Sequence, residues 1–253
     1  MIPAVILAKG NSNRIPRKNF KDFCGKPLVH WTIEQCKCSK LIDQVIVSTD
    51  DAEIKEYAES LGVRVIDREY RLTLCTASHT VITVIEQLVS EGEDVDYFLT
   101  PLPTSPIRLP WDMDGLIALG IAGGYDNTAT CCEQLESVLY RQVRGCEHET
   151  IVWDKHNGYR VDGGGMSCTR LDWYRQYVKD IPFTDAEFDA EFENQPEKLP
   201  HLFAYVMHEW QTPELDMPEH WGIAEAVMEK CILEPLGEDC YTKYGQQEKV
   251  WIK

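Results

Sequence analysis

The stretch from Pro3 to Cys38 reads PAVILAKGNSNRIPRKNFKDFCGKPLVHWTIEQCKC, and its pattern organises the rest of the chain. Its apolar start, Pro3–Ala8, predicts a buried first strand, and the polar segment Lys9–Lys26 predicts a long loop. The segment Pro27–Cys38 predicts a helix that begins at a proline, whose fixed backbone suits a first helical turn. The stretch therefore predicts a strand, a basic loop at its carboxyl end, and a helix.

The same alternation continues along the chain. Strands are predicted at 44–49, 63–66, 96–100, 127–132 and 202–208, and helices from Asp50 or Asp51 to about Leu61 and at 78–91, 111–122 and 218–231. Residues 133–165 predict a hairpin-like excursion. Alternating strands and helices are typical of an α/β fold with a mainly parallel sheet and helices on both faces. Ligands bind beyond the carboxyl ends of such strands, so we expect the site at residues 9–26, 48–51 and 101–108.

Charge and composition exclude several classes of function. The 253 residues include 25 Lys and Arg but 42 Asp and Glu, a net charge of −17, which repels nucleic acid and anionic membranes. No apolar run reaches the roughly 18 residues of a membrane helix, and the N-terminus reads as a core strand rather than a signal peptide. The ten cysteines show no CxxC pair or zinc-finger spacing, so we expect reduced thiols and a cytoplasmic protein.

The loop after the first strand has the composition of an anion site. Gly10, Asn11 and Ser12 would let backbone N–H groups approach phosphates, and Arg14, Arg17 and Lys18 follow. A triphosphate needs this combination of close amide donors and fixed positive charge. The loop is not a P-loop, because Gly25-Lys26 is followed by proline, and it contains no GxGxxG. The alternative interpretation is that these cations are only solvated.

The loop also resembles the opening motif of the acylneuraminate cytidylyltransferases, which is close to ARGGSKGIPRKNIK. Here Ala8–Lys21 reads AKGNSNRIPRKNFK, and the DFCGKPL that follows resembles the pseudaminic acid branch. VIVSTDDAEI at 45–54, PTSPIR at 103–108 and ELDMPEHWGIAEAV at 214–227 resemble later family motifs, in order. The resemblance covers residues 2–132 well and 202–228 moderately, whereas 133–200 match poorly.

This resemblance implies a Rossmann-like nucleotide-diphospho-sugar transferase fold. We expect a cytidylyltransferase domain at 1–232, with a divergent sugar-site and dimerisation region at about 133–200, and a peripheral tail at 233–253. The implied reaction is attack of the anomeric hydroxyl of an acidic nine-carbon (sialic-type) sugar on the α-phosphate of CTP, with Mg²⁺ as cofactor and pyrophosphate as leaving group. The resemblance also suggests a homodimer.

The resemblance further implies site residues by position. Those for the nucleotide are Lys9, Gly10, Ser12, Lys18, Asn19, Arg68 and Ser78. Those for the sugar are Thr104, Ser105 and Arg108. Lys18 and Asp216 are the predicted catalytic residues. The resemblance also implies Glu214 and Asp216 as the Mg²⁺ ligands. Residues two apart on a strand share a face, so both carboxylates could reach one ion. Asp216 is alternatively a base for the attacking hydroxyl, and both acids alternatively only favour the dipole of the following helix.

Several positions depart from the family pattern. Lys9 replaces an arginine, Asn13 a lysine, and Glu214 an aspartate, while Leu102 stands where sialic acid synthetases commonly have a glutamine. The identity of the sugar therefore stays open. One alternative is an octulosonate (Kdo-type) cytidylyltransferase, against which the IPRKN segment argues. The other is a nucleotide-binding protein with a decayed site, against which the presence of both Lys18 and Asp216 argues.

Overall fold

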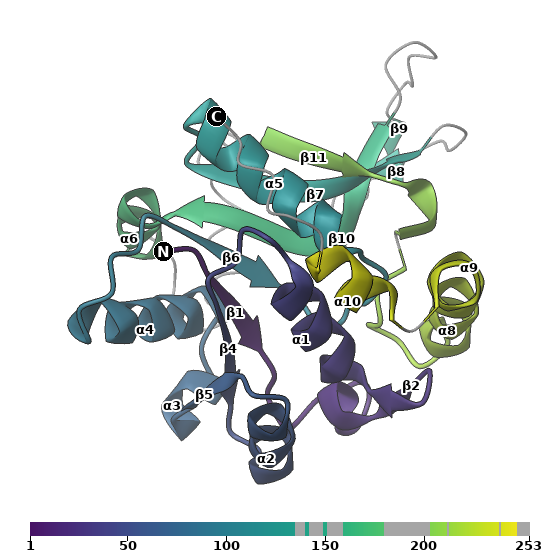
Figure 1. Cartoon of the computed structure of the whole chain (residues 1–253), viewed down its shortest axis with the longest axis horizontal. Helices are drawn as coiled ribbons and strands as arrows, with labels where there is room; N and C mark the ends of the chain where they lie inside the picture. The colour runs from purple at the N-terminus through teal and green to yellow at the C-terminus, as the bar shows by residue number, and fades with distance from the viewer. Residues whose placement is uncertain are drawn as a thin grey trace.

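A seven-stranded sheet forms the centre of the computed structural model, which describes residues 1–134, 140–141, 149–150, 159–179, 203–211, 213–237 and 239–246. The strand order is β11-β7-β10-β6-β1-β4-β5 (Figure 1). These strands are β1 (Pro3–Leu7), β4 (Gln44–Thr49), β5 (Arg64–Asp67), β6 (Tyr97–Pro101), β7 (Asn127–Gln134), β10 (Tyr159–Arg170) and β11 (Phe203–Met207). Only β10 runs antiparallel to its neighbours in this sheet, so the predicted mainly parallel α/β fold is confirmed.

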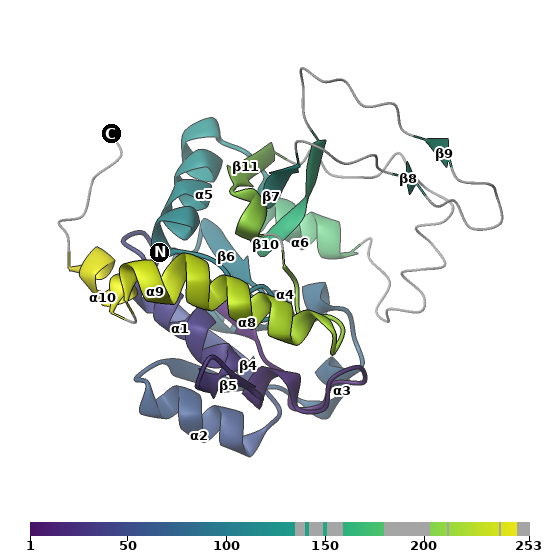
Figure 2. The same ribbon diagram turned by 90° about the vertical axis from the view of Figure 1, so that its right-hand side faces the viewer.

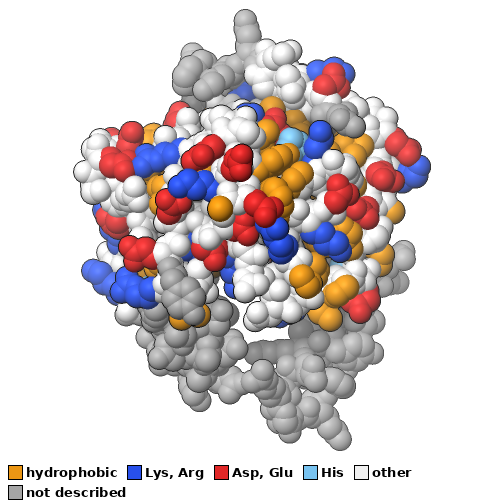
Figure 3. Space-filling view, turned by 90° about the horizontal axis from the view of Figure 1, so that it is seen from below, with side chains coloured by type: hydrophobic (Ala, Val, Ile, Leu, Met, Phe, Trp, Pro, Cys, Tyr) orange, Lys and Arg blue, Asp and Glu red, His pale blue; other side chains and the backbone are white. Residues whose placement is uncertain are grey.

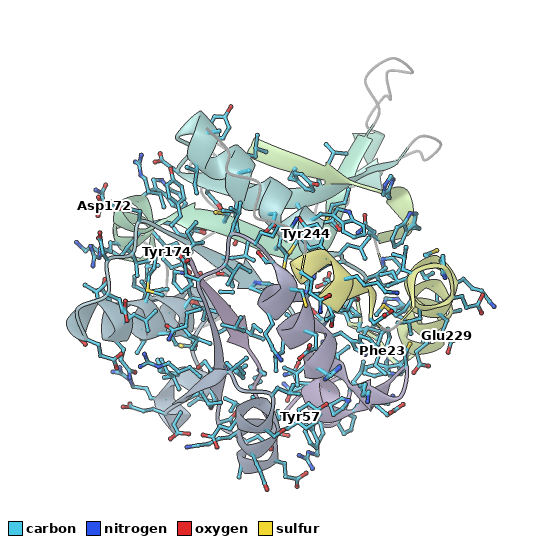
Figure 4. All side chains as sticks on the ribbon, in the orientation of Figure 1. Phe23, Tyr57, Asp172, Tyr174, Glu229 and Tyr244 are labelled. Carbon is cyan, nitrogen blue, oxygen red and sulfur yellow. The ribbon has the colours of Figure 1, made fainter. Side chains whose placement is uncertain are left out.

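Helices cover both faces of the sheet because successive side chains of each strand point to opposite sides. Ala4 and Ile6 of β1 pack in one apolar cluster with α1 (Leu28–Cys38), α2 (Ala52–Ser60) and α5 (Pro110–Gly123). Val5 packs in the opposite cluster with α4 (Ala77–Ser90) and α6 (Leu171–Lys179). Tyr174 of α6 anchors that side, 5.0 Å edge-on from the ring of Phe98 (Figure 4). In Figure 1, α4 lies to the left of β1 and α1 to its right.

A third apolar cluster joins the N-terminal loop to the C-terminal helices. The loop contains η1 (Lys18–Phe20), β2 (Asp22–Phe23) and β3 (Lys26–Pro27), and it packs against α8 (His220–Met228) and η4 (Glu229–Leu233). Phe23 and Trp221 meet edge-on at 5.7 Å, and Leu215, just before α8, is fully buried there. Figure 2 shows α8, α9 (Glu234–Leu236) and α10 (Cys240–Gly245) in succession in front of α1. This cluster brings residues about 200 positions apart to one end of the sheet.

Part of the tail expected to be peripheral packs on the domain. Tyr241 of α10 is 3% exposed, and its hydroxyl accepts a hydrogen bond from Gln35 of α1 at 3.1 Å. Tyr244 of α10 donates to the Asp114 carboxylate at 2.7 Å. Residues 240–246 therefore belong to the folded body, while 247–253 lie outside the described residues.

The helix boundaries agree closely with the sequence signals. Asp51 caps α2, as predicted, because its carboxylate accepts from the backbone N–H groups of Glu53 and Ile54 at 2.9 and 3.1 Å. Gly124 ends α5 in the left-handed conformation that glycine adopts without strain. No helix of the described part of the chain is long and apolar enough to cross a membrane.

Several local features differ from the sequence prediction or were missed by it. Residues 159–170 form the central strand β10, with a register shift between Asp162 and Ser167 at the glycine run. Glycines within a strand often mark such a bulge, and the sequence predicted a hairpin-like excursion that ended at residue 165. The helices α3 (Tyr70–Thr73) and α6 were not predicted. Glu214 and Asp216 lie in a loop, so the prediction that a strand gives them a common face is wrong. The short pair β8 (Tyr140–Arg141) and β9 (Glu149–Thr150) lies within the predicted excursion, and η3 (Glu209–Gln211) follows β11.

Candidate functional site

A pocket of about 380 Å³ lies at the carboxyl ends of β1 and β6, where the sequence predicted the site. Its walls come from the loop after β1, the segment around α3, the PTSPIR segment and the loop before α8. The lining residues are Leu7, Lys9, Ser12, Asn13, Arg14, Lys18, Asn19, Arg68, Thr73, Cys75, Ala77, Thr80, Leu102, Pro103, Thr104 and Asp216.

The loop after β1 is folded back by its own polar contacts. The Asn19 side chain donates to the Lys9 carbonyl at 2.9 Å, which holds both residues at the pocket wall. The backbone N–H of Gly10 donates to the Asp50 carboxylate at 2.8 Å, and an added Cβ would lie 2.6 Å from Asp51. Gly10 thus joins the loop to the end of β4 and does not line the pocket.

Lys18 and Asp216 meet in this pocket. The Lys18 ammonium donates to the Asp216 carboxylate at 3.1 Å and to the Leu215 carbonyl at 2.9 Å. Its side chain is only 12% exposed, whereas that of Asp216 is 44% exposed. Leu215 holds this segment in place, because it is fully buried and its N–H donates to the Thr104 carbonyl at 2.7 Å. The two predicted catalytic residues are therefore brought together from opposite ends of the chain.

Arg68 forms a buried part of the pocket wall. Its backbone N–H donates to the Thr49 carbonyl at 2.7 Å, and the residue is 9% exposed. Within the described part of the chain its Nε has no hydrogen-bond partner, which is a rare state for a buried donor. Burial lowers the pKa of the guanidinium, and the Asp50 carboxylate acts in the opposite direction.

Ser78 is placed differently from the other predicted nucleotide residues. It lies in the first turn of α4, where its carbonyl accepts from the Tyr174 hydroxyl at 3.3 Å. The neighbouring residues Ala77 and Thr80 line the pocket, and Ser78 does not. The position that the resemblance implied for Ser78 thus lies next to the pocket lining and not in it.

Of the three predicted sugar residues only Thr104 lines the pocket. Ser105 is 2% exposed and Arg108 fully buried behind the wall. The Arg108 guanidinium donates to Thr32 Oγ1 at 2.8 Å, Gln35 Oε1 at 3.3 Å and the Gly165 carbonyl at 3.3 Å. Burial lowers its pKa to about 10. In this arrangement Arg108 supports the pocket wall from behind.

Gly165 of β10 fixes the same wall from the opposite side. Its carbonyl accepts from the Leu102 N–H at 2.8 Å. Its φ is +48°, and an added Cβ would lie 2.4 Å from the Ser105 hydroxyl oxygen and 3.3 Å from the Leu102 Cβ. The position of Leu102 in the pocket therefore depends on a glycine about 60 residues later.

The two predicted metal ligands do not face the pocket equally. Asp216 lines it, whereas the Glu214 carboxylate accepts from Thr104 Oγ1 at 3.3 Å and is not part of the lining. No group of three His, Cys, Asp or Glu side chains that could hold a metal occurs among the described residues. Mg²⁺ is commonly held by one or two carboxylates together with substrate phosphates and water. The residues present fit a cation of that kind, with Asp216 as its protein ligand.

The pocket lining has an excess of positive charge. It carries four cations, Lys9, Arg14, Lys18 and Arg68, and a single carboxylate, that of Asp216. The described part of the face seen in Figure 3 has both acidic and basic side chains. A concave site with this excess of positive charge suits a small polyanion, as the sequence predicted.

Comparison with known proteins supports this picture. Residues 4–97 match the family model described as cytidylyltransferase. The chain is 37% identical over 106 residues to a pseudaminic acid cytidylyltransferase of Campylobacter jejuni, which is 41% of this chain and 46% of that protein. It is 32% identical over 126 residues to N-acylneuraminate cytidylyltransferase A of Danio rerio, 50% of this chain and 29% of that protein. The matched region thus spans less than half the length of these relatives.

The fold is similar over a much larger region. A solved CMP:2-keto-3-deoxy-manno-octonic acid synthetase in complex with CTP superposes with a TM-score of 0.65 at 17% identity, covering 92% of this chain and all of that one. The solved synthetase shows the fold alone, and the match to the family model over residues 4–97 shows similarity to the cytidylyltransferases. The sequence is similar in particular to nonulosonic acid cytidylyltransferases, in agreement with the predicted family.

Proposed function

We propose that the protein is a cytidylyltransferase that transfers CMP from CTP to the anomeric hydroxyl of a nonulosonic acid. The observation that carries the proposal is the meeting of Lys18 with Asp216, 198 residues apart, at 3.1 Å in the cationic pocket. A carboxylate beside a nearly buried lysine, with three further cations in the lining, suits the triphosphate of a nucleotide and a hydroxyl that must attack it.

In the proposed reaction the sugar hydroxyl oxygen forms a bond to the α-phosphorus of CTP. The bond from that phosphorus to the bridging oxygen of the β-phosphate breaks, and pyrophosphate leaves. Lys18 stabilises the charge that develops on the phosphates, because its side chain is held at the wall by the Leu215 carbonyl. Asp216, half exposed beside it, would hold the divalent cation or, in the alternative, accept the hydroxyl proton.

The same lining assigns roles to the other residues. Lys9, Ser12 and Asn19 lie together on the loop after β1 and would bind the triphosphate. Arg68 adds a positive charge to the lining that would face the nucleotide. When bound, Mg²⁺ would neutralise phosphate charge, and Asp216 would be its main protein ligand. Leu102 and Pro103 add an apolar patch on the wall beside Thr104, where we place the sugar.

Two further expectations belong to this proposal. We propose a homodimer and a cytoplasmic location, supported by the family resemblance. The region 133–200, expected to shape the sugar site and the dimer contact, is described only in part. Sedimentation at micromolar concentration tests the dimer, and a monomer would contradict it.

The experiment for the function is pyrophosphate release from purified protein with Mg²⁺ and a panel of acidic α-keto sugars. Nine-carbon sialic, legionaminic and pseudaminic acids and an eight-carbon octulosonate are each paired with CTP, ATP, GTP or UTP. We expect turnover with CTP and one of the nine-carbon acids. Turnover with the octulosonate alone would favour the Kdo-type alternative. CTP binding without turnover would favour the decayed binding protein, and no CTP binding would contradict all three.

A further inference from the structure

Arg14 occupies a position in the pocket that the proposed reaction does not yet use. The chain has Arg14 where the motif ARGGSKGIPRKNIK has glycine, and Asn13 where it has lysine, so the loop's cation is shifted by one position. Arg14 lines the pocket, and its Nη1 lies 3.3 Å from Asp216 Oδ2. Lys18 contacts the other oxygen, Oδ1, at 3.1 Å.

Both oxygens of the Asp216 carboxylate are therefore covered by cations. Each oxygen keeps a second lone pair, but a divalent metal at this carboxylate would lie beside two cations, so charge repulsion favours displacement of one of them. Lys18 and Arg14, the two cations that contact Asp216, differ in how firmly they are held. The Lys18 side chain is 12% exposed and has a second contact at the Leu215 carbonyl, whereas the Arg14 side chain is 62% exposed. Exposed ion pairs are weak, so Arg14 is the partner that gives way.

Once released, the Arg14 side chain is a free cation at the wall of the same pocket. A guanidinium presents a planar fork of donors that matches phosphate oxygens, and such charge-assisted bonds are stronger than a surface ion pair to a carboxylate. The long side chain starts from the loop segment that also carries Ser12, so the phosphates of a bound nucleotide lie within its reach.

We propose that Arg14 is an exchange residue of the site, which covers one oxygen of Asp216 in the ligand-free protein and moves to the triphosphate when the nucleotide and its divalent cation bind. This inference rests on the proposed function. If Arg14 exchanges in this way, it weakens metal binding in the absence of nucleotide, and it strengthens nucleotide binding both with and without the metal. Those two effects have opposite signs, which a merely structural residue would not produce.

The test compares Arg14→Gln with the unmodified protein and with Arg17→Gln. Arg17 is a matched control on the same loop. The sequence grouped it with the cations of the anion site, but it does not line the pocket, is 46% exposed and pairs with Asp51 and Glu53. Binding of Mn²⁺ alone is followed by electron paramagnetic resonance. Binding of CTP in excess EDTA is followed by isothermal titration calorimetry. Neither readout depends on turnover.

For Arg14→Gln we expect Mn²⁺ to bind about threefold more tightly, in keeping with loss of a surface ion pair, and CTP about tenfold more weakly. We expect Arg17→Gln to match the unmodified protein in both titrations. Equal Mn²⁺ binding by Arg14→Gln and the unmodified protein, including no binding by either, would overturn the exchange. Equal CTP binding, or the same changes in Arg17→Gln, would overturn it too. An unmodified protein that binds no CTP would instead contradict the proposed function.

Discussion

The glycine that supports the pocket wall gives a sharp test of how the fold shapes the site. In Gly165→Ala the backbone must keep φ near +48°, a left-handed conformation that an alanine adopts at a cost of about 1–2 kcal/mol. The new methyl group would also lie 2.4 Å from the Ser105 hydroxyl oxygen, and overpacking of this kind costs about 1–3 kcal/mol. We therefore expect a loss of about 2–5 kcal/mol in the free energy of unfolding.

The matched control is Gly124→Ala at the end of α5. Gly124 has φ +61°, but an added Cβ would meet no atom within 4 Å, so only the backbone penalty of about 1–2 kcal/mol applies. Urea titrations of the two variants, compared with the unmodified protein, separate the steric contribution from the conformational one.

The substitution Gly165→Ala should also affect catalysis, because it shifts Leu102, whose N–H donates to the Gly165 carbonyl. Small misplacements of a substrate-positioning wall lower rates strongly, so we expect kcat/KM for the sugar to fall at least about tenfold in Gly165→Ala. In Gly124→Ala it should stay unchanged. If the two variants lose equal stability, or if Gly165→Ala keeps full kcat/KM, the account of this wall is refuted.

Three further predictions concern single side chains. Arg68→Met should raise the KM for CTP about tenfold, because the pocket lining loses one of its cations. Arg71→Met, outside the pocket lining, should leave that KM unchanged, and equal effects would contradict the assignment. Asp216→Asn should raise the Mg²⁺ concentration that gives the half-maximal rate at least about tenfold, and Glu214→Gln should raise it less than about threefold. The reason is that Asp216 lines the pocket and Glu214 does not. A larger effect of Glu214→Gln would make Glu214 the main ligand. Burial raises the pKa of Cys168 to about 12, so the folded protein keeps a proton that the unfolded chain releases above about pH 8.5. The contribution of this thiol to the free energy of unfolding is therefore complete below that pH and is lost as the pH rises toward 12, at about 1.4 kcal/mol per pH unit. Between pH 9 and 10 the free energy of unfolding of Cys168→Ala should fall less steeply with pH than that of the unmodified protein, by that amount per pH unit. An unchanged slope would contradict the buried thiol.

Much of the fold could be predicted because its signals are local. The alternation of Ala4, Val5 and Ile6 between two apolar clusters, the Asp51 cap and the glycine after α5 each act within a few residues. The strand β10 was missed because its glycines weaken the strand pattern, and its place in the sheet depends on pairing with β6 and β7. Pairing over such separations leaves no local trace in a single sequence.

The site residues also fall into those that local sequence signals predict and those that depend on distant parts of the chain. Lys9, Ser12, Lys18 and Asn19 follow one strand, and the loop that carries them was predicted from its charges and glycine. The meeting of Lys18 with Asp216 followed only from family resemblance, because no local pattern links residues 198 apart. Arg108 was predicted to touch the sugar, but it lies buried, with Thr32 and Gln35 as partners on α1. A basic residue of a motif can line a pocket or lie buried behind its wall. Which of the two occurs depends on residues elsewhere in the chain, which the motif does not contain.

The central claim is that Lys18 performs charge stabilisation in a CMP transfer at this pocket. The most direct measurement is single-turnover formation of the CMP-sugar by Lys18→Met, with CTP affinity measured on the same sample. Lys26→Met serves as the control, because Lys26 is exposed on β3 and outside the pocket lining. We predict that Lys18→Met forms product at least about 100-fold more slowly while still binding CTP, and that Lys26→Met keeps the full rate. A Lys18→Met protein that forms product at the unmodified rate would contradict the account.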